Sequence, residues 1–291
     1  MLKTKGSRYN FPRHGFYRPS PSADLCRAYM PRAPLNQLRA ISVTESLSSP
    51  PGVVDLWYYF CEDADAQLLA SHQALLTPDE LERCSRFRFE RDRRLFLATR
   101  ALARTVLSNY AAVAPADWRF ATNDHGKPLI SAPIVAPAIH FNLANTLGLV
   151  VCAVSVAHEV VGVDAERMDR KVEALALADR YFSLAEASKL RGMSAPEQSD
   201  FFFSYWTLKE SYIKARGLGL TLPLGQFSFH IDNEIGIEFE AGFADDASSW
   251  RFALLDAPLD HRIAVSVKTG GAALSMRASR FVPLRGMMDL T

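Results

Sequence analysis

The sequence predicts an α+β fold, and three observations lead to this prediction. Short runs rich in β-branched and aromatic residues are typical of strands, and 53–60 is the first of them. The segment 201–217 has apolar residues at helical spacing and ends at a glycine, which indicates a long helix. Further short apolar runs at 227–231, 236–239, 251–255 and 263–267 are typical of antiparallel strands. Each half of the chain therefore contains strands and one long helix.

Composition excludes several classes of protein. The chain has 291 residues, 48% of them hydrophobic, which is enough for a substantial core in one or two domains. Lys+Arg (33) balance Asp+Glu (32), so charge gives no argument for a nucleic-acid partner, and we expect none. The longest apolar run, 147–157, is too short to span a bilayer, so we expect no membrane partner. A P-loop and a G-x-G-x-x-G motif are both missing, which argues against a Walker kinase or a Rossmann enzyme.

The two ends of the chain differ from the rest. Residues 1–51 are basic, with only Asp24 and Glu45 as acids, and show no sustained periodicity, so we expect a disordered N-terminal extension. A transit peptide is an alternative, although an upstream start codon or a plain tail is favoured over it. Residues 271–291 show no clear pattern and are expected to form a C-terminal tail. Four scattered cysteines without metal-ligand spacing indicate free thiols, which favours the cytoplasm.

A helix is predicted to begin at Thr77. Thr77 is a suitable N-cap, Pro78 suits the first helical position, and Glu80 completes a capping box. The stretch that follows, 83–108, is rich in arginine. These arginines either form a solvated basic face or hold a phosphate, because guanidinium groups bind phosphate through paired donors.

A turn and a strand pair follow. Gly126-Lys127-Pro128 follows an Asn-Asp-His turn and holds a lysine at a rigid corner, which on its own would be a surface turn. Residues 140–155 are predicted to form strand, turn and strand. Further on, Ser183 and Glu186 have capping-box spacing, so Glu186 is expected to be structural.

Two carboxylates share one face of a predicted strand at 160–166. Side chains alternate along a strand, so Asp164 and Glu166 lie together, opposite Val161, Val163 and Ala165. Neighbouring carboxylates repel each other unless a positive charge lies between them, and Mg²⁺ commonly binds such oxygens. The alternative is an exposed edge with two solvated acids.

The long helix carries a second charged pair. Glu210 and Lys214 are four residues apart and share a face with Trp206. In isolation, this pair would be a surface ion pair that contributes only ~0.3–0.5 kcal/mol. Lys214 also lies in the last turn, where the helix dipole favours cations.

Together, the two stretches resemble the hallmark motifs of the 4'-phosphopantetheinyl transferase superfamily. The first motif is G-V-D-A-E at 162–166, and the second, about 40 residues later, is W-T-L-K-E-S-Y-I-K-A-R-G-L-G-L at 206–220. The chain length resembles that of the surfactin-type branch, which has two halves in one chain. The resemblance implies a pseudo-twofold pair of similar α/β halves: 52–156 with coenzyme A-binding elements, and 157–270 with the Mg²⁺-binding and catalytic motifs.

The resemblance also implies a reaction. A serine of an acyl, aryl or peptidyl carrier protein receives 4'-phosphopantetheine from coenzyme A, and 3',5'-ADP leaves. The implied Mg²⁺ ligands are Asp164, Glu166 and Glu210. The implied catalytic residues are Glu210, Lys214 and Lys209, and Asp164, Lys209 and Lys214 would also face coenzyme A. The enzyme is expected to be a cytoplasmic monomer.

The remaining coenzyme A contacts implied by the resemblance lie in the first half. They are Arg83, Lys127, Pro128 and Asn145, with Arg83 on the 3'-phosphate. The family's F-N-[IL]-S-H-S motif appears as F-N-L-A-N-T, so Ala144 and Asn145 replace Ser and His. Asn145 can donate a hydrogen bond but carries no charge. Two alternatives therefore stay open: a non-catalytic protein that binds coenzyme A or a carrier, and another Mg²⁺-dependent phosphoryl-transfer enzyme.

Overall fold

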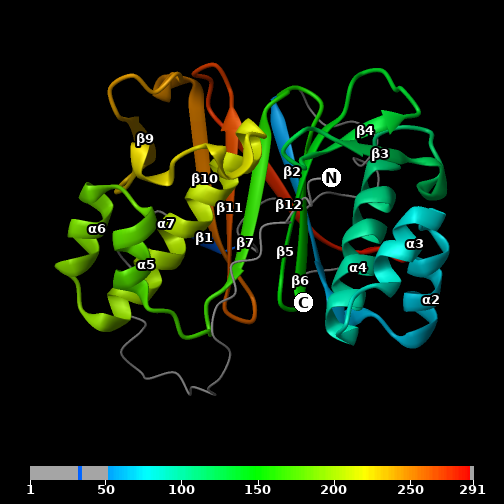
Figure 1. The fold of residues 1–291 in the computed structure, drawn as a ribbon. Coiled ribbons are helices and arrows are strands. Elements are labelled where there is room, and N and C mark those ends of the chain that lie inside the picture. Colours follow the sequence, from blue (N-terminus) through cyan, green and yellow to red (C-terminus); the bar gives the residue numbers. More distant parts are fainter. Residues whose placement is uncertain (1–31, 35–51, 289–291) are drawn as a thin grey trace.

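The computed structural model describes residues 32–34 and 52–288, and within them the chain repeats one pattern twice (Figure 1). Each copy is a strand, three helices, a two-stranded hairpin and two antiparallel strands. The first copy comprises β2 (Val53–Phe60), α2 (Ala66–Ala74), α3 (Pro78–Ser85), α4 (Glu90–Leu107), β3 (Arg119–Thr122), β4 (Pro128–Ala132), β5 (His140–Thr146) and β6 (Leu149–Ser155). The second comprises β7 (Val161–Arg167), α5 (Ala174–Tyr181), α6 (Leu184–Arg191), α7 (Ala195–Arg216), β8 (Phe227–Ile231), β9 (Ile235–Phe239), β10 (Trp250–Ala257) and β11 (His261–Lys268).

The two copies also have the same strand order. The first sheet contains β2–β6–β5 and the second β7–β11–β10, so the first strand of each copy lies beside the last. One parallel strand extends each sheet: β12 (Ser275–Val282) pairs with β2, and β1 (Arg32–Pro34) pairs with β10. The short strand β13 (Gly286–Met287) completes the first sheet. The predicted α+β fold with two similar halves is confirmed.

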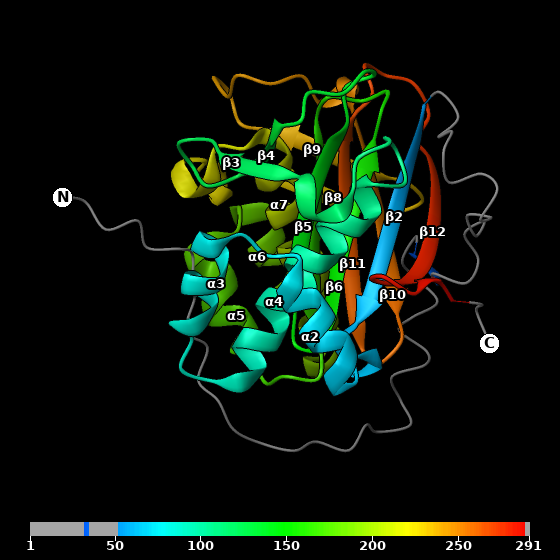
Figure 2. The ribbon, with the colours of Figure 1, turned by 90° about the vertical axis from the view of Figure 1, so that its right-hand side faces the viewer.

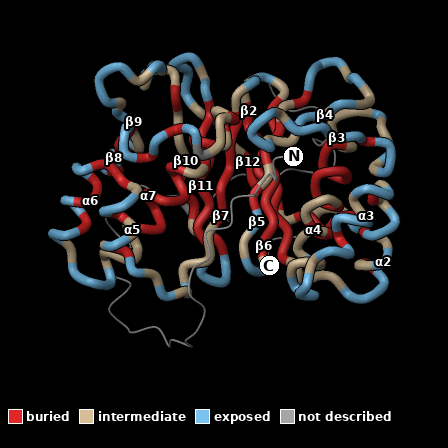
Figure 3. The backbone as a smooth tube through the Cα atoms, viewed as in Figure 1, coloured by how far each residue is buried: buried red, intermediate tan, exposed pale blue. Residues whose placement is uncertain are grey.

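The sheets pack face to face, and helices cover their outer faces (Figures 1 and 3). Side chains that alternate along β2 contact both neighbouring layers. Leu56 and Tyr58 pack between the sheets, whereas Trp57 and Tyr59 pack outward in the cluster that contains residues of α4. All eight residues of β2 are buried, since both faces of the strand are covered. The protein therefore has four layers: helix, sheet, sheet and helix.

A buried cation occupies the same place in each half. In the first half, Arg104 of α4 lies 2.6 Å from the capping-box Glu80 of α3 and donates to the Trp118 carbonyl at 2.5 Å. In the second half, Lys209 of α7 lies 2.8 Å from the capping-box Glu186 of α6 and donates to the Phe227 carbonyl at 2.5 Å. Each cation ties the third helix to the second helix and to the start of the hairpin. The structural role expected for Glu186 agrees with these contacts.

Helix α7 begins earlier than expected, at Ala195 instead of 201. Ser194 and Glu197 form a capping box, and a proline follows in the first turn. The helix ends at Gly217, which has a left-handed φ of 65°. The arginine-rich stretch is also divided, because α3 ends at Ser85 and α4 begins at Glu90.

The segment 271–291 differs from the expected tail, because it contains β12. Figure 2 shows β12 (red) beside β2 (blue), although they come from opposite ends of the chain. Arg277 of β12 is buried against Asp55 of β2, with Nε 2.7 Å from Oδ1. The sequence of this segment shows no clear strand pattern, and the partner of Arg277 lies 222 residues earlier in the chain.

The expected extension 1–51 contains β1, so three of its residues form a strand paired with 254–256. The rest of that segment, apart from these three residues, lies outside the described residues, as do 289–291. Among the helices that the structure describes, none is long and apolar enough to cross a membrane.

Candidate active site

Three carboxylates and a lysine meet where β7 passes α7. Side chains alternate along β7, so Val161 and Val163 pack into the core between the sheets. Asp164 and Glu166 point away from that core. Lys214 of α7 lies 2.5 Å from Asp164 Oδ1. Glu210, one turn earlier on the helix, interacts electrostatically with both Asp164 and Lys214. The structure therefore brings together the predicted residues Asp164, Glu166, Glu210 and Lys214, called the acidic cluster below.

A residue missed by the sequence interpretation borders this cluster. Arg170 lies 2.5 Å from Glu166 Oε2 and stacks 5.5 Å above the Phe203 ring. Glu166 lies near the end of β7 and Arg170 in the turn that follows, so the i,i+4 rule for helices could not indicate this contact. Arg170 fixes one Glu166 oxygen and offsets part of the negative charge of the cluster.

Gly162 sets the distance between β7 and α7. A Cβ atom at this position would lie 2.1 Å from the Ser211 carbonyl oxygen and 2.4 Å from the Ala215 amide nitrogen. Such distances lie far inside van der Waals contact, so only glycine lets the strand approach the helix this closely. A hydrogen bond between the Ser211 and Ser266 hydroxyls, at 2.6 Å, joins the same helix to β11.

We expect Gly162→Ala to lower the thermal stability strongly, because α7 would have to move away from β7. Overpacking of this kind typically costs ~1–3 kcal/mol and occasionally more. The control is Gly236→Ala in β9, where a Cβ atom would meet nothing within 4 Å. Thermal melts of both variants test this, and equal melting temperatures would contradict the close approach described here.

Burial dominates the electrostatics of the acidic cluster. It raises the pKa of Asp164, although Lys214 opposes this effect. Burial and then the charge of Asp164 raise the pKa of Glu166 to about 7, and the same two causes raise the pKa of Glu210 to about 7. Burial alone would lower the pKa of Lys214, but Asp164, Glu210 and Glu166 together outweigh it, so this pKa is raised. Glu166 and Glu210 are therefore poised to exchange protons near neutral pH.

Two oxygens of the cluster have no partner in the described part of the chain. Asp164 Oδ2 and Glu210 Oε1 are buried and accept no hydrogen bond there. Buried oxygens without donors are costly, so these two atoms are suited to bind a cation. Within the described ranges, no three His, Cys, Asp or Glu side chains are gathered as tightly as around a bound ion. In this structure, Lys214 supplies the positive charge beside Asp164.

Lys209 does not join the cluster, in contrast to the expectation. It is fully buried, and its ammonium group contacts Glu186 and the carbonyls of Leu224 and Phe227. The reason is helix geometry: neighbouring residues on a helix point about 100° apart, so Lys209 and Glu210 face different sides of α7.

The predicted Lys127 also has partners other than a ligand. Its ammonium group donates to the carbonyls of Ala215, at 2.9 Å, and Val161, at 3.3 Å. Burial lowers the pKa of Lys127 to about 8. Pro128, the next residue, begins β4 and lines a pocket in the first half.

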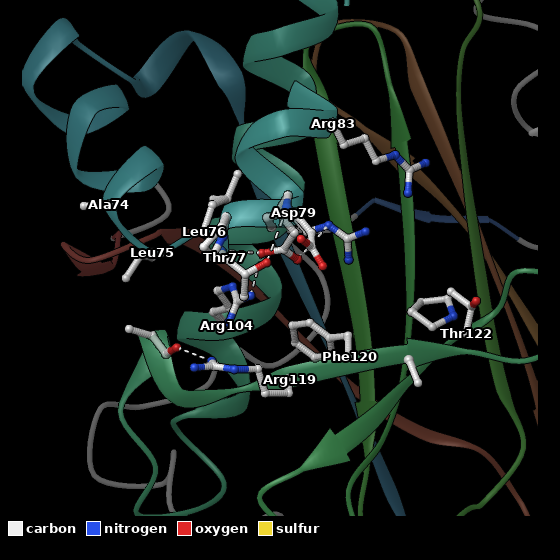
Figure 4. A pocket seen from close by; sticks show the side chains of 16 residues that line it. Ala74, Leu75, Leu76, Thr77, Asp79, Arg83, Arg104, Arg119, Phe120 and Thr122 are labelled. Carbon is white, nitrogen blue, oxygen red and sulfur yellow. Dashed lines mark hydrogen bonds and ion pairs between the residues drawn. The ribbon is translucent and has the colours of Figure 1, made fainter. Parts of the chain in front are cut away.

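This pocket has a volume of about 660 Å³ and is lined by α3, α4 and the β3–β4 hairpin (Figure 4). Arg83, Arg100, Arg104 and Arg119 contribute to its lining. Arg100 and Arg104 both pair with Glu80. Arg83 lies 5.6 Å above the Phe96 ring and has no carboxylate partner among the described residues. Arg119 also has no carboxylate partner there, but it donates to the carbonyls of Ala116 and Trp118. Of these arginines, Arg83 is therefore well placed to bind an anion.

The Ala144-Asn145 pair lies on β5. Ala144 is buried between the sheets, so its side chain cannot reach a ligand. Asn145 is exposed and donates to the Thr99 hydroxyl of α4 at 3.3 Å. Neither Asn145 nor Thr99 lines the pocket, although Arg100, the residue after Thr99, does.

Fold and site together define a class of protein with two similar α/β halves in one chain, an acidic cluster in one half and an arginine-lined pocket in the other. Two sequence profiles match the chain. One, described as the 4'-phosphopantetheinyl transferase superfamily, covers 160–266, and the other, described as the N-terminal part of 4'-phosphopantetheinyl transferase, covers 63–157. Together they span both halves.

Characterised relatives agree with these profiles. The chain is 36% identical over 167 residues to 4'-phosphopantetheinyl transferase Sfp of Bacillus subtilis (57% of this chain, 71% of the relative). It is 33% identical over 180 residues to 4'-phosphopantetheinyl transferase HetI of Nostoc sp. (60% and 75%). It is 30% identical over 238 residues to a phosphopantetheinyl transferase of Thraustochytrium sp. (75% and 80%). The chain belongs to the 4'-phosphopantetheinyl transferase superfamily, in its surfactin-type branch.

Proposed function

We propose that this enzyme transfers 4'-phosphopantetheine from coenzyme A to a serine of an acyl, aryl or peptidyl carrier protein. The serine oxygen forms a bond to the β-phosphorus, the bond from that phosphorus to the bridging oxygen breaks, and 3',5'-ADP leaves with that oxygen. The observation that carries this proposal is the acidic cluster of Asp164, Glu166, Glu210 and Lys214 beside β7. Such a transfer needs neutralised phosphate charge and a positioned proton acceptor.

Two oxygens of the cluster support a Mg²⁺ site. Asp164 Oδ2 and Glu210 Oε1 are buried and unpartnered within the described chain, and carboxylate oxygens are the donors that Mg²⁺ prefers. We propose that Asp164, Glu166 and Glu210 hold the ion. When bound, Mg²⁺ would supply positive charge to the diphosphate.

The side chains of the cluster have separate roles in this proposal. Glu210 accepts the serine proton, because a carboxylate beside Asp164 and Lys214 is a suitable general base. Lys214 keeps its positive charge, since its pKa is raised, and stabilises the negative charge of the diphosphate and of the leaving group. Lys209 has a structural role, because all of its described contacts lie within the protein core.

We propose that coenzyme A extends from the pocket to the acidic cluster. The β3–β4 hairpin supports this path, because Thr122 and Pro128 line the pocket while Lys127 contacts α7 one residue beyond Lys214. We propose that Arg83 binds the 3'-phosphate and that Asn145 adds a neutral hydrogen bond nearby. The unpaired thiols of Cys61, Cys84 and Cys152 support a cytoplasmic location, and we propose that the enzyme acts as a monomer.

The test is mass spectrometry of an apo carrier protein incubated with the enzyme, coenzyme A and Mg²⁺. The transferase adds the phosphopantetheine mass to the carrier, and omission of Mg²⁺ or addition of a chelator should prevent the change. A protein that only binds coenzyme A, or another phosphoryl-transfer enzyme, would leave the carrier without this mass. Either outcome would refute the proposed function.

Without bound metal, the repulsion among the carboxylates of the acidic cluster should make the stability of the protein depend on pH. Glu210 has a pKa of about 7 in the folded protein against a usual value of 4.5, so the folded state holds more protons than the unfolded state between these values. The contribution of Glu210 to the free energy of unfolding is therefore greatest at low pH. It falls as the pH rises between these two pKa values and is constant above them.

In a chelator, we thus expect the melting temperature of the wild type, relative to Glu210→Gln, to fall by at least ~3 °C between about pH 5 and pH 8. Mg²⁺ should reverse this loss at the higher pH. A wild type that keeps a constant difference from Glu210→Gln, with or without Mg²⁺, would contradict both the shifted pKa and the metal assignment.

A further inference from the structure

One turn of the first half donates hydrogen bonds to the C-terminal end of α7 in the second half. The turn 123–127 lies between β3 and β4, and Asn123 Nδ2 donates to the Gly217 carbonyl at 2.7 Å. Lys127 Nζ donates to the Ala215 carbonyl at 2.9 Å. Ala215 lies in the last turn of α7 and Gly217 is its C-cap, and carbonyl groups at the end of a helix lack amide partners in the next turn. The first half therefore satisfies the end of α7.

The turn is rigid enough to hold both donors in place. Asn123 Oδ1 accepts from the amides of His125, at 3.0 Å, and Lys127, at 2.9 Å. The Asn123 amide donates to the Lys127 carbonyl at 3.0 Å, which closes the turn. Gly126 has a φ of 87°, which favours glycine at this position. Asn123 and Lys127 thus approach α7 from a fixed frame.

Lys127 also holds β7. Its ammonium group donates to the Val161 carbonyl at 3.3 Å, next to Gly162, the residue at which β7 touches α7. The two carbonyls that Lys127 joins lie one residue beyond Lys214 and three residues before Asp164. Lys127 therefore ties together the two elements whose separation sets the Lys214–Asp164 contact.

We propose that Asn123 and Lys127 form an interlobe clasp, and that Lys127 is a positioning residue for Asp164 and Lys214 instead of a ligand of a coenzyme A phosphate. The proposal rests on the proposed function for its kinetic consequences. Its geometry stands on the contacts alone: two donors of the ammonium group are directed at protein carbonyls, and the side chain is partly buried. The clasp also fixes the position of the pocket in the first half relative to the acidic cluster in the second half.

The decisive variant is Lys127→Met, which keeps the length of the side chain and removes its donors. We expect kcat to fall by ~10–100-fold, because small displacements of catalytic groups have effects of this size. The Kd for coenzyme A, measured by calorimetry without a carrier, should change by less than about threefold. Lys127→Arg should restore part of kcat, since a guanidinium can also donate to two carbonyls.

Hydrogen exchange gives a readout that needs no reaction. Without substrates, the amides of 215–217 should exchange faster in Lys127→Met than in the wild type, by ~10-fold or more. Lys189→Met is the matched control, because Lys189 is exposed on α6, outside the acidic cluster, and its partner Asp232 is also exposed. It should change neither kcat nor exchange. Asn123→Ala provides a second route to the same loosening if Lys127→Met fails to fold.

The possible outcomes separate the clasp from the proposed function. If Lys127→Met raises the Kd for coenzyme A by about tenfold or more and leaves exchange at 215–217 unchanged, Lys127 binds phosphate and the clasp is wrong. If the wild type modifies no carrier, the proposed function fails, yet faster exchange in the variant would still support the clasp. Unchanged exchange in both Lys127→Met and Asn123→Ala overturns it.

Discussion

Asp164→Asn should reduce phosphopantetheine transfer by ~10³-fold or more while the protein stays folded. The substitution keeps the shape of the side chain but removes one of the proposed metal ligands and the partner of Lys214. Lys214 would then pair with Glu166 or Glu210 and would no longer be fixed near the diphosphate. Transfer rates by mass spectrometry, over a range of Mg²⁺ concentrations, provide the measurement.

Stability should change little in this variant, for an electrostatic reason. Removal of one partner from a buried ion pair usually costs several kcal/mol because a charge remains unpaired. Here, Glu166 and Glu210 remain to balance Lys214, and their mutual repulsion with Asp164 is relieved. Asp169→Asn is the control, since Asp169 pairs with Arg167 outside the cluster. A folded Asp164→Asn enzyme with the wild-type rate at saturating Mg²⁺ would refute the assignment.

The elements that the sequence predicts well are those whose signals are local. The strand 53–60 matches β2, and 227–231 matches β8. Alternation at 160–166 correctly separates Asp164 and Glu166 from the apolar face of β7. The end of α7 at Gly217 follows from its left-handed conformation. In each case, the periodicity of the apolar residues or a residue typical of turns predicts the element.

Residues whose partners are distant in sequence were harder to place. Lys127 reads as an exposed corner, but its partners at Val161 and Ala215 lie 34 and 88 residues away. Lys209 lies beside Glu210 in the chain, yet its partner Glu186 belongs to another helix. Only the packing of α7 against α6 and β7 decides which charged residues face the cluster.

The C-terminal strand leads to the second large prediction: a chain that ends at Gly270 should not fold stably. The truncation removes β12, which pairs with β2 in the first sheet, and exposes the edge of β2. It also removes Phe281, whose ring packs 5.2 Å from that of Trp57. Circular dichroism and thermal melts of the truncated protein test this. A truncated protein that melts like the wild type would show that 271–291 is a dispensable tail after all.

A point variant isolates the main interaction of this strand. Arg277→Met leaves Asp55 buried without its cation, which should cost ~3–5 kcal/mol. Asp55 also accepts a hydrogen bond from Tyr110 at 2.7 Å, so the loss should loosen the contact between β2 and the segment after α4. Arg285→Met removes an exposed ion pair with Asp65 and should leave the stability nearly unchanged. Denaturant unfolding of both variants measures the difference. Equal costs would show that burial of the Arg277–Asp55 pair does not hold the end of the chain in the first sheet.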